Sequence, residues 1–285
     1  MTKGPVLQAA DLTSLALAFL LALSSLLSIL YTLLFRIKTR RNCPLSPLHT
    51  FNSLWIHRTL LSLSSILIAL YQFLHYAHFC TSSLLLSQGV AQPSFFLIAL
   101  ILLEDSLESK QCPYGFLGIV LACTPPFLLE IVILYVAPHV HAAGLVFLEP
   151  FVRTSLADGT CDYPLAGTMV LAGFGAVYVP CFLSICWKMQ AMVINRGLKV
   201  RVFGLVGAVV VGVTGQVVAL AAAAWWRPGN WVFEGLGLVG FGCIAGCVVV
   251  CEGILVVRPI TDAWAAGLAL QEKRSLEGRK LGLVP

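Results

Sequence analysis

Long runs of apolar residues dominate the chain, and each run is about as long as a bilayer is thick. A helix that crosses the roughly 30 Å hydrocarbon core needs about 20 mostly apolar residues. Because unpaired backbone N–H and C=O groups are too costly in lipid, each such run is predicted to be a helix. Six runs meet these conditions plainly: Leu12–Phe35, Leu60–Phe79, Cys112–Ala137, Tyr163–Trp187, Val202–Trp226 and Trp231–Val257.

A seventh run, Leu84–Leu103, is weaker because its first half carries Gln88, Gln92 and Pro93. The distribution of positive charge decides whether it crosses. With seven spans and an external N-terminus, 15 of the 18 Lys and Arg residues fall on the cytoplasmic side, whereas without this span only 7 do. Cytoplasmic loops of membrane proteins carry the excess of Lys and Arg. The sequence therefore predicts seven spans, with the N-terminus outside and the C-terminus in the cytoplasm.

Composition supports a membrane protein and excludes a soluble one. Hydrophobic residues make up 59% of the chain and charged residues 11%, with a mean hydropathy of +0.91. A soluble domain is about 25% charged. The net charge of +5 is dispersed, so no nucleic-acid partner is expected. The predicted fold class is an all-α polytopic helical membrane protein, in the plasma membrane or an endomembrane. A seven-helix bundle over residues 1–257 is followed by a cytoplasmic tail over residues 258–285.

Two carboxyl groups fall well inside predicted spans, whereas Glu234 lies close to the outer end of the last one. Glu130 lies roughly two helical turns below the external end of the fourth span, after the Pro125-Pro126 pair, which should kink the helix. Glu252 lies toward the inner end of the last span, six residues before Arg258. An ionisable residue within a span costs on the order of 3 kcal/mol and usually faces the bundle interior. Each acid could line a ligand or proton site or lock helices together, and the sequence leaves both readings open.

Three glutamines complete the set of ligand or pathway candidates. Gln88 and Gln92 are spaced i, i+4, so they are expected to share one face of the third helix and to look into the bundle. Gln216 is central in the sixth span. Buried amides commonly hydrogen-bond between helices. A purely structural role therefore stands beside a role in binding for all three.

Cys80 and Cys161 are the two cysteines that fall outside in this topology, which makes them candidates for a disulfide. A weaker external cluster of histidines could sense pH or hold a metal, namely His75, His78, His139 and His141. These histidines come from separate segments, and no ligand spacing makes them converge, so no metal site is predicted. The sequence contains no nucleotide-binding loop, nucleophile motif or haem-ligand pair. Neither a cofactor nor an enzymatic activity is expected.

Several short stretches resemble a family of plant multi-pass membrane proteins of unknown function, sometimes grouped as candidate seven-helix receptors. They lie at residues 89–96 (Gly-x-Ala-x-Pro-x-Phe-Phe), 124–127 (Thr-Pro-Pro-Phe), 193–202 (Val-Ile-Asn-Arg-Gly-Leu-x-x-Arg-Val) and 233–234 (Phe-Glu). The resemblance implies a plant origin and the seven-helix fold. It assigns no catalytic or binding residue.

The sequence favours a receptor-like signalling or scaffold protein that binds a small ligand at its external side. The basic segments Arg36–Arg41 and Lys188–Arg201 would then contact an intracellular protein or anionic lipid. The alternative is a small-solute transporter or channel, in which Glu130 and the three glutamine faces line the path. Prolines within the spans suit this alternative, since transport sites often use interrupted helices. Stripes of small residues in the last two spans are also compatible with a homo-oligomer.

Overall fold

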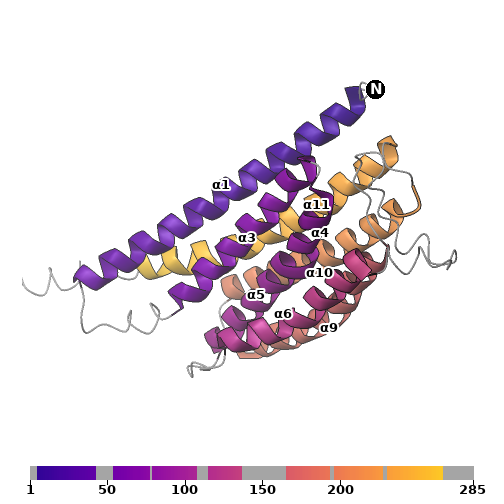
Figure 1. The fold of residues 1–285 in the computed structure, drawn as a ribbon. Helices are drawn as coiled ribbons and strands as arrows, with labels where there is room; N and C mark the ends of the chain where they lie inside the picture. Colours follow the sequence, from indigo (N-terminus) through magenta and orange to yellow (C-terminus); the bar gives the residue numbers. More distant parts are fainter. Residues whose placement is uncertain are drawn as a thin grey trace, which may run out of the picture.

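The structure, a computed structural model, describes residues 5–42, 54–77, 79–107, 115–136, 165–192, 196–226 and 230–265, and no strand occurs among them. Seven helices in these ranges are long and apolar enough to cross a membrane. They pack side by side into an elongated bundle (Figure 1). The predicted all-α fold and the number of membrane-length helices are confirmed, including the doubtful third span. The N-out orientation stays a prediction.

Several of the long helices contain a short π-helical segment, labelled η. The elements are α1 (Pro5–Asn42), α3 (Trp55–Tyr76), α4 (Cys80–Leu84), η1 (Leu85–Ala91), α5 (Gln92–Leu107), α6 (Gly115–Ile131), η2 (Val132–Val136), α9 (Leu165–Met192), α10 (Arg196–Ala223), α11 (Trp231–Glu252) and η4 (Gly253–Val257). After η4 the helix continues as far as Ala265.

Two helices extend beyond the predicted spans. The second long helix begins at Trp55, before the predicted start of the span at Leu60, so Arg58, expected in a cytoplasmic segment, lies in the first turn of α3 with 4% of its surface exposed. The last helix continues past residue 257 to Ala265, into the predicted tail. Hydropathy alone places such ends poorly, because long basic side chains can lie along a helix and still reach the membrane surface.

The third span, formed by α4, η1 and α5, is the most enclosed helix of the bundle. In its apolar window 61% of the residues are buried, compared with 22% in the span formed by α6 and η2. Gln88 and Gln92 are 5% and 1% exposed, so both face protein and not lipid. A helix surrounded by other helices can carry polar residues that a lipid-facing helix cannot. This position explains the weak hydropathy of its first half.

α1 lies along one flank of the bundle and packs on α3, α11 and η4 (Figure 1). Its buried positions alternate steps of three and four residues, at Ser14, Ala18, Leu21, Ser25, Ser28, Thr32 and Phe35. This seven-residue repeat turns one narrow stripe toward the bundle, while leucines such as Leu27 and Leu34 stay exposed. Small side chains such as those in the stripe let membrane helices approach closely.

Each π-helical segment in the described ranges ends two residues before a proline. The segments η1, η2 and η4 are followed in this way by Pro93, Pro138 and Pro259. A proline has no N–H to donate, and its ring clashes with the carbonyl four residues earlier, so a wider turn before it relieves the conflict. In η1 the backbone N–H of Gln92 accordingly donates to the carbonyl of Ser87, five residues back.

The prolines inside α6 and α9 behave differently. Pro125 and Pro126 lie within α6, and Pro180 lies within α9, without a π-helical turn beside them. The irregular turns instead adjoin the buried polar residues, because η1 contains Gln88, η2 begins two residues after Glu130 and η4 begins directly after Glu252. Wide turns of this kind are often found at functional sites.

Candidate functional site

Glu130, Gln88 and Gly167 meet in the interior of the bundle, and we call these three residues the Glu130 centre. Glu130 lies on α6, Gln88 in η1 and Gly167 in the first turn of α9. A Cβ atom added to Gly167 would lie 2.9 Å from Gln88 Oε1 and 3.2 Å from each carboxyl oxygen of Glu130. Glycine at this position therefore allows two other helices to bring three oxygen atoms against α9.

A second glycine lets η1 approach α6. A Cβ atom at Gly89 would lie 3.3 Å from Phe127 Cδ2 and 3.6 Å from Glu130 Cβ. Both are close contacts from the helix that carries Glu130. The wide turn of η1 and the absence of a side chain at Gly89 together bring the backbone beside Gln88 against α6. The local sequence Gln-Gly, followed by Pro93, thus positions the amide.

Three acceptor oxygens of the Glu130 centre lack a hydrogen-bond partner in the described structure. Glu130 is 0% exposed, and neither of its carboxyl oxygens has a hydrogen-bond partner within the described part of the chain. The same holds for Gln88 Oε1. A buried polar group without a partner costs about 1–3 kcal/mol, and more when charged. A proton or a small cation would satisfy such a set, because each can be shared between a carboxylate and an amide oxygen.

The other two glutamines are buried but do not belong to this centre. Gln92 donates from Nε2 to Ser87 Oγ at 3.0 Å, which ties two residues of the same helix together. Its Oε1 has no partner in the described ranges. Gln216 is 5% exposed and lies on the buried side of α10, one turn from Gly212. The structure thus brings Glu130 and Gln88 together and leaves Gln216 on a separate helix face.

Glu252 lies in a different environment, which we call the Glu252 cluster. Its hydrogen-bonding neighbours are the hydroxyl groups of Ser65, Ser25 and Ser62, from α3 and α1. Ser25 and Ser65 donate to backbone carbonyls of their own helices, at 2.9 and 3.0 Å. Ser62 has no other partner in the described structure and can donate to the carboxyl group. Glu252 Oε1 remains without a hydrogen bond.

Close packing between α10 and α11 involves glycines of the sixth span. A Cβ atom at Gly212 would lie 2.6 Å from Cys247 Cβ, and one at Gly215 would lie 2.8 Å from Cys243 Sγ. These glycines are therefore used inside the monomer. Gly242 and Gly246 of α11 have no such neighbour within 4 Å in the described structure.

Basic residues gather at one end of the bundle. The described ones are Arg36, Lys38, Arg40, Arg41, Arg58, Lys188, Arg196, Lys199, Arg201 and Arg258, near the end of α1 and α9 and the start of α3 and α10. Several of them contact other side chains. Arg36 lies 3.5 Å from the ring centre of Trp55, and Lys38 lies 4.3 Å from that of Trp264. Arg201 donates to Asp262 at 2.7 Å.

The predicted disulfide and histidine cluster fall largely outside the described residues. This applies to Cys161, to the side chain of Cys80, and to His78, His139 and His141. His75 lies near the end of α3, where its ring is 5.9 Å from that of Tyr71. In the part of the chain that the structure describes, no three His, Cys, Asp or Glu residues form a metal-binding group. The disulfide stays a prediction.

Comparison with known proteins identifies a family and no activity. The family model described as "Uncharacterised conserved protein UCP031277" matches residues 5–274, so the chain belongs to this uncharacterised conserved family. No curated protein matches the chain.

Proposed function

We propose that this member of an uncharacterised conserved family is a transporter or channel for a small solute, coupled to a proton or a small cation held at the Glu130 centre. One observation carries the proposal. Three acceptor oxygens from Glu130 and Gln88 converge beside Gly167, deep in the bundle, without a described hydrogen-bond partner. Ionisable residues inside membrane spans commonly mark ion pathways and proton relays.

The chemistry of the centre suits a small positive charge. A carboxylate and an amide oxygen are hard oxygen ligands, which accept from a proton donor or coordinate a cation. A proton on Glu130 would be donated to Gln88 Oε1, whereas a cation would contact both groups directly. Either event changes the attraction between α6 and the third span. Binding and release are therefore coupled to the packing of these two helices.

Interrupted helices support the same proposal. The wide turn η1 contains Gln88, and η2 begins two residues beyond Glu130. Transport sites near the middle of a bilayer typically use such irregular turns, where the backbone lines a cavity instead of lipid. A small change at either turn shifts the side chain next to it. We infer that η1 and η2 are the segments that move when the centre gains or loses its charge.

The basic end of the bundle supports the proposed orientation. Every Lys and Arg in the described ranges lies at the end where α1 and α9 finish and α3 and α10 begin. By the positive-inside rule this end faces the cytoplasm. The N-terminal end of α1 then faces outward, and the Glu130 centre lies in the outer half of the membrane. The proposed ion would therefore enter from the outside.

Flux into proteoliposomes tests the proposal. Purified protein is reconstituted, and uptake of ²²Na⁺ and ⁸⁶Rb⁺ is measured beside acidification reported by a trapped pH-sensitive dye. We expect flux of one of these ions in the wild type and its loss in Glu130→Gln. Glu252→Gln is the matched control, since it makes the same chemical change at another buried acid, and it should retain flux.

Two outcomes would overturn the proposal. One is wild-type protein that carries none of the three ions under a gradient of either direction. The other is a Glu130→Gln variant that folds and transports as well as the wild type. In both cases the carboxyl group would be a structural element that joins α6 to the third span.

A receptor-like signalling or scaffold role, as in the plant seven-helix proteins that the sequence resembles, is the second candidate. Arg196 and Lys199 support it, because both are exposed in the first turn of α10 at the basic end. Neutralising both residues should abolish recruitment to vesicles of phosphatidylserine while leaving Glu130-dependent flux intact. Loss of flux in Glu130→Gln, with vesicle recruitment kept in the neutralised variant, would favour the transporter. Loss of recruitment in the neutralised variant, with no flux in the wild type, would favour the receptor or scaffold.

A further inference from the structure

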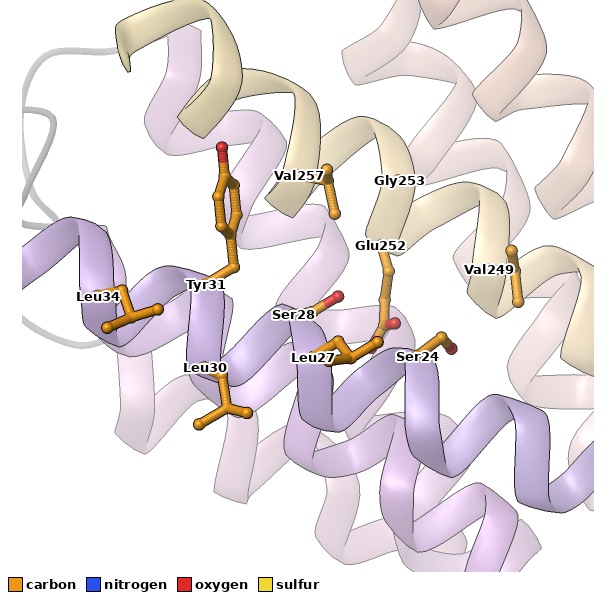
Figure 2. A pocket seen from close by; sticks show the side chains of 10 residues that line it. All are labelled: Ser24, Leu27, Ser28, Leu30, Tyr31, Leu34, Val249, Glu252, Gly253 and Val257. Carbon is orange, nitrogen blue, oxygen red and sulfur yellow. The ribbon is translucent and has the colours of Figure 1, made fainter.

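A groove about 600 Å³ in volume lies between α1 and α11, with Glu252 at its base (Figure 2). The walls are apolar side chains that face the lipid, among them Leu27, Leu34 and Val249, which are 57%, 60% and 49% exposed. Pockets of 300–1,000 Å³ are typical of small-molecule sites. Because its walls are apolar and lie within spans, the groove is open to molecules dissolved in the bilayer and not to those in water.

Polar atoms are confined to the base and one end of the groove. Figure 2 shows the carboxyl group of Glu252 reaching from α11 toward Ser24 and Ser28 of α1. Ser24 donates to the carbonyl of Leu21 at 2.9 Å, so its proton is already used. Glu252 is 3% exposed and its Oε1 has no hydrogen bond in the described structure. The groove therefore holds a buried acceptor that lacks a donor.

The charge of the lining selects the kind of head group that fits. Among the described residues that line the groove, Glu252 carries the sole carboxyl group, and none is Lys, Arg or His. An anionic amphiphile would bring like charges together in an apolar setting, which is costly. A protonated amine would supply both the opposite charge and up to three N–H donors. Its aliphatic chain would cover the leucine walls.

An aromatic group closes the end of the groove toward the basic face. Tyr31, one of the lining residues, stacks on Trp264 with ring centres 6.1 Å apart, and Lys38 Nζ lies 4.3 Å from the centre of the Trp264 ring. Glu252 is six residues from Arg258, or about 9 Å along the helix. An amine at Glu252 would thus contact the carboxyl group directly and lie more than one helical turn from Arg258. The chain of the ligand would extend away from the basic residues along α1.

From this arrangement we propose that the groove between α1 and α11 binds a membrane-dissolved amphiphile, an aliphatic chain that bears a protonated amine, with Glu252 as its counter-ion. The site is separate from the Glu130 centre, and the proposal does not depend on transport. Binding would fill the flank between α1 and the bundle and hold α1 in place. The ligand would stabilise the folded protein, because it binds the native state and not the unfolded chain.

Thermal unfolding in nanodiscs tests the proposal with three probes of equal chain length. Dodecylamine, dodecanol and dodecanoic acid are added at the same mole fraction of the lipid, and the unfolding midpoint is followed by tryptophan fluorescence. Dodecylamine should raise the wild-type midpoint by roughly 3 °C, whereas the alcohol and the acid should not. The rise should vanish in Glu252→Gln and persist in Glu130→Gln, which separates this site from the proposed transport site.

A second pair of variants keeps the test valid if Glu252→Gln fails to fold. Leu27→Trp fills the groove while leaving Glu252 unsubstituted, and it should also abolish the rise. Leu26→Trp alters the neighbouring exposed leucine, which does not line the groove, and should retain it.

Three results would overturn the proposal. The first is no rise with dodecylamine in the wild type. The second is an equal rise with dodecanol, which would mean that the groove recognises a donor and not a charge. The third is a change of oligomeric state by light scattering in Leu27→Trp but not in Leu26→Trp, which would make the groove a contact between copies of the chain.

Discussion

The two buried acids of this protein, Glu130 and Glu252, lie in opposite environments. Glu130 is enclosed by α6, η1 and α9, and both of its oxygens lack a described partner. Glu252 has three serine hydroxyls as neighbours and lies at the base of a groove that opens toward lipid. Enclosure by protein favours a small charge that moves along the bundle interior. Access from the bilayer favours a larger ligand that enters sideways. The same side chain thus suits different partners because of what surrounds it.

The largest loss of stability is expected from filling the space beside the Glu130 centre. In Gly167→Leu the new side chain would collide with Gln88 Oε1 and both Glu130 oxygens, since a Cβ atom alone already approaches to 2.9 Å. We expect a loss of about 3 kcal/mol in the free energy of unfolding, seen as a lower thermal midpoint and a smaller monodisperse fraction. Gly173→Leu, on the same helix with no described atom within 4 Å, is the control and should fold normally. Equal behaviour of the two variants would contradict the close approach.

A smaller effect, on the ion concentration that flux requires, is expected from straightening the π-helical turn that carries Gln88. Pro93→Ala restores an N–H that the carbonyl of Gly89 can accept, so η1 should relax toward α-helix and turn Gln88 away from Glu130. We expect ion flux to require an approximately tenfold higher ion concentration, which corresponds to about 1.4 kcal/mol. Pro180→Ala lies in α9 without a π-helical turn and should leave flux unchanged. An unchanged ion dependence in Pro93→Ala would show that the wide turn does not position the amide.

Glu130→Gln should stabilise the protein at alkaline pH, where Glu130 has no proton to donate to Gln88 Oε1, when no small metal cation is present. The amide supplies its own N–H₂ donor to Gln88 Oε1, which relieves an unpaired acceptor worth about 1 kcal/mol. With choline as the only added cation, the thermal midpoint should rise. Glu252→Gln should change it less, because the serine hydroxyls already face that carboxyl group. A fall in the midpoint of Glu130→Gln would mean that the carboxyl group has a structural partner.

The smallest effect on stability is expected from breaking an ion pair at the basic end of the bundle. Arg201 and Asp262 are 2.7 Å apart, but their side chains are 35% and 56% exposed. Exposed pairs contribute about 0–1 kcal/mol, and solvent screening places this one near the bottom of that range. A double-mutant cycle of Arg201→Ala and Asp262→Ala, followed by urea unfolding in detergent, should give a coupling energy below about 0.5 kcal/mol. A larger coupling would show that the end of the last helix is held to α10 by charge.

Much of the fold could be predicted from periodicity and charge. Less of the Glu130 centre could be predicted in this way. Apolar runs and the count of positive charges indicated seven helices, including the polar third span. The positions of Glu130 and Gln88 inside spans marked them as candidates, but their convergence depends on Gly167, which lies 79 residues after Gln88 and in no recognisable motif. Packing of separate helices sets such distances, and no local pattern records it. Gln216 shows the converse, since it is central in its span and buried, yet no described contact joins it to either acid.

The serines around Glu252 did leave a signal in the sequence. Ser25 and Ser28 fall on the seven-residue repeat of α1, and Ser62 and Ser65 share one face of α3. Two polar stripes on neighbouring helices indicate a polar contact inside the membrane. The prolines that follow each π-helical segment are a second signal, although the prolines of α6 and α9 show that proline alone does not predict a wide turn.

The most direct test of the central claim is infrared difference spectroscopy of the carboxyl groups in reconstituted protein. Spectra are recorded from acidic to alkaline pH, and with Na⁺ or K⁺ replacing choline. The account predicts a carboxyl or carboxylate band that responds to one of these changes, disappears in Glu130→Gln and persists in Glu252→Gln. If the bands that respond are identical in wild type and Glu130→Gln, no proton or cation exchanges at Glu130, and the proposed function is wrong.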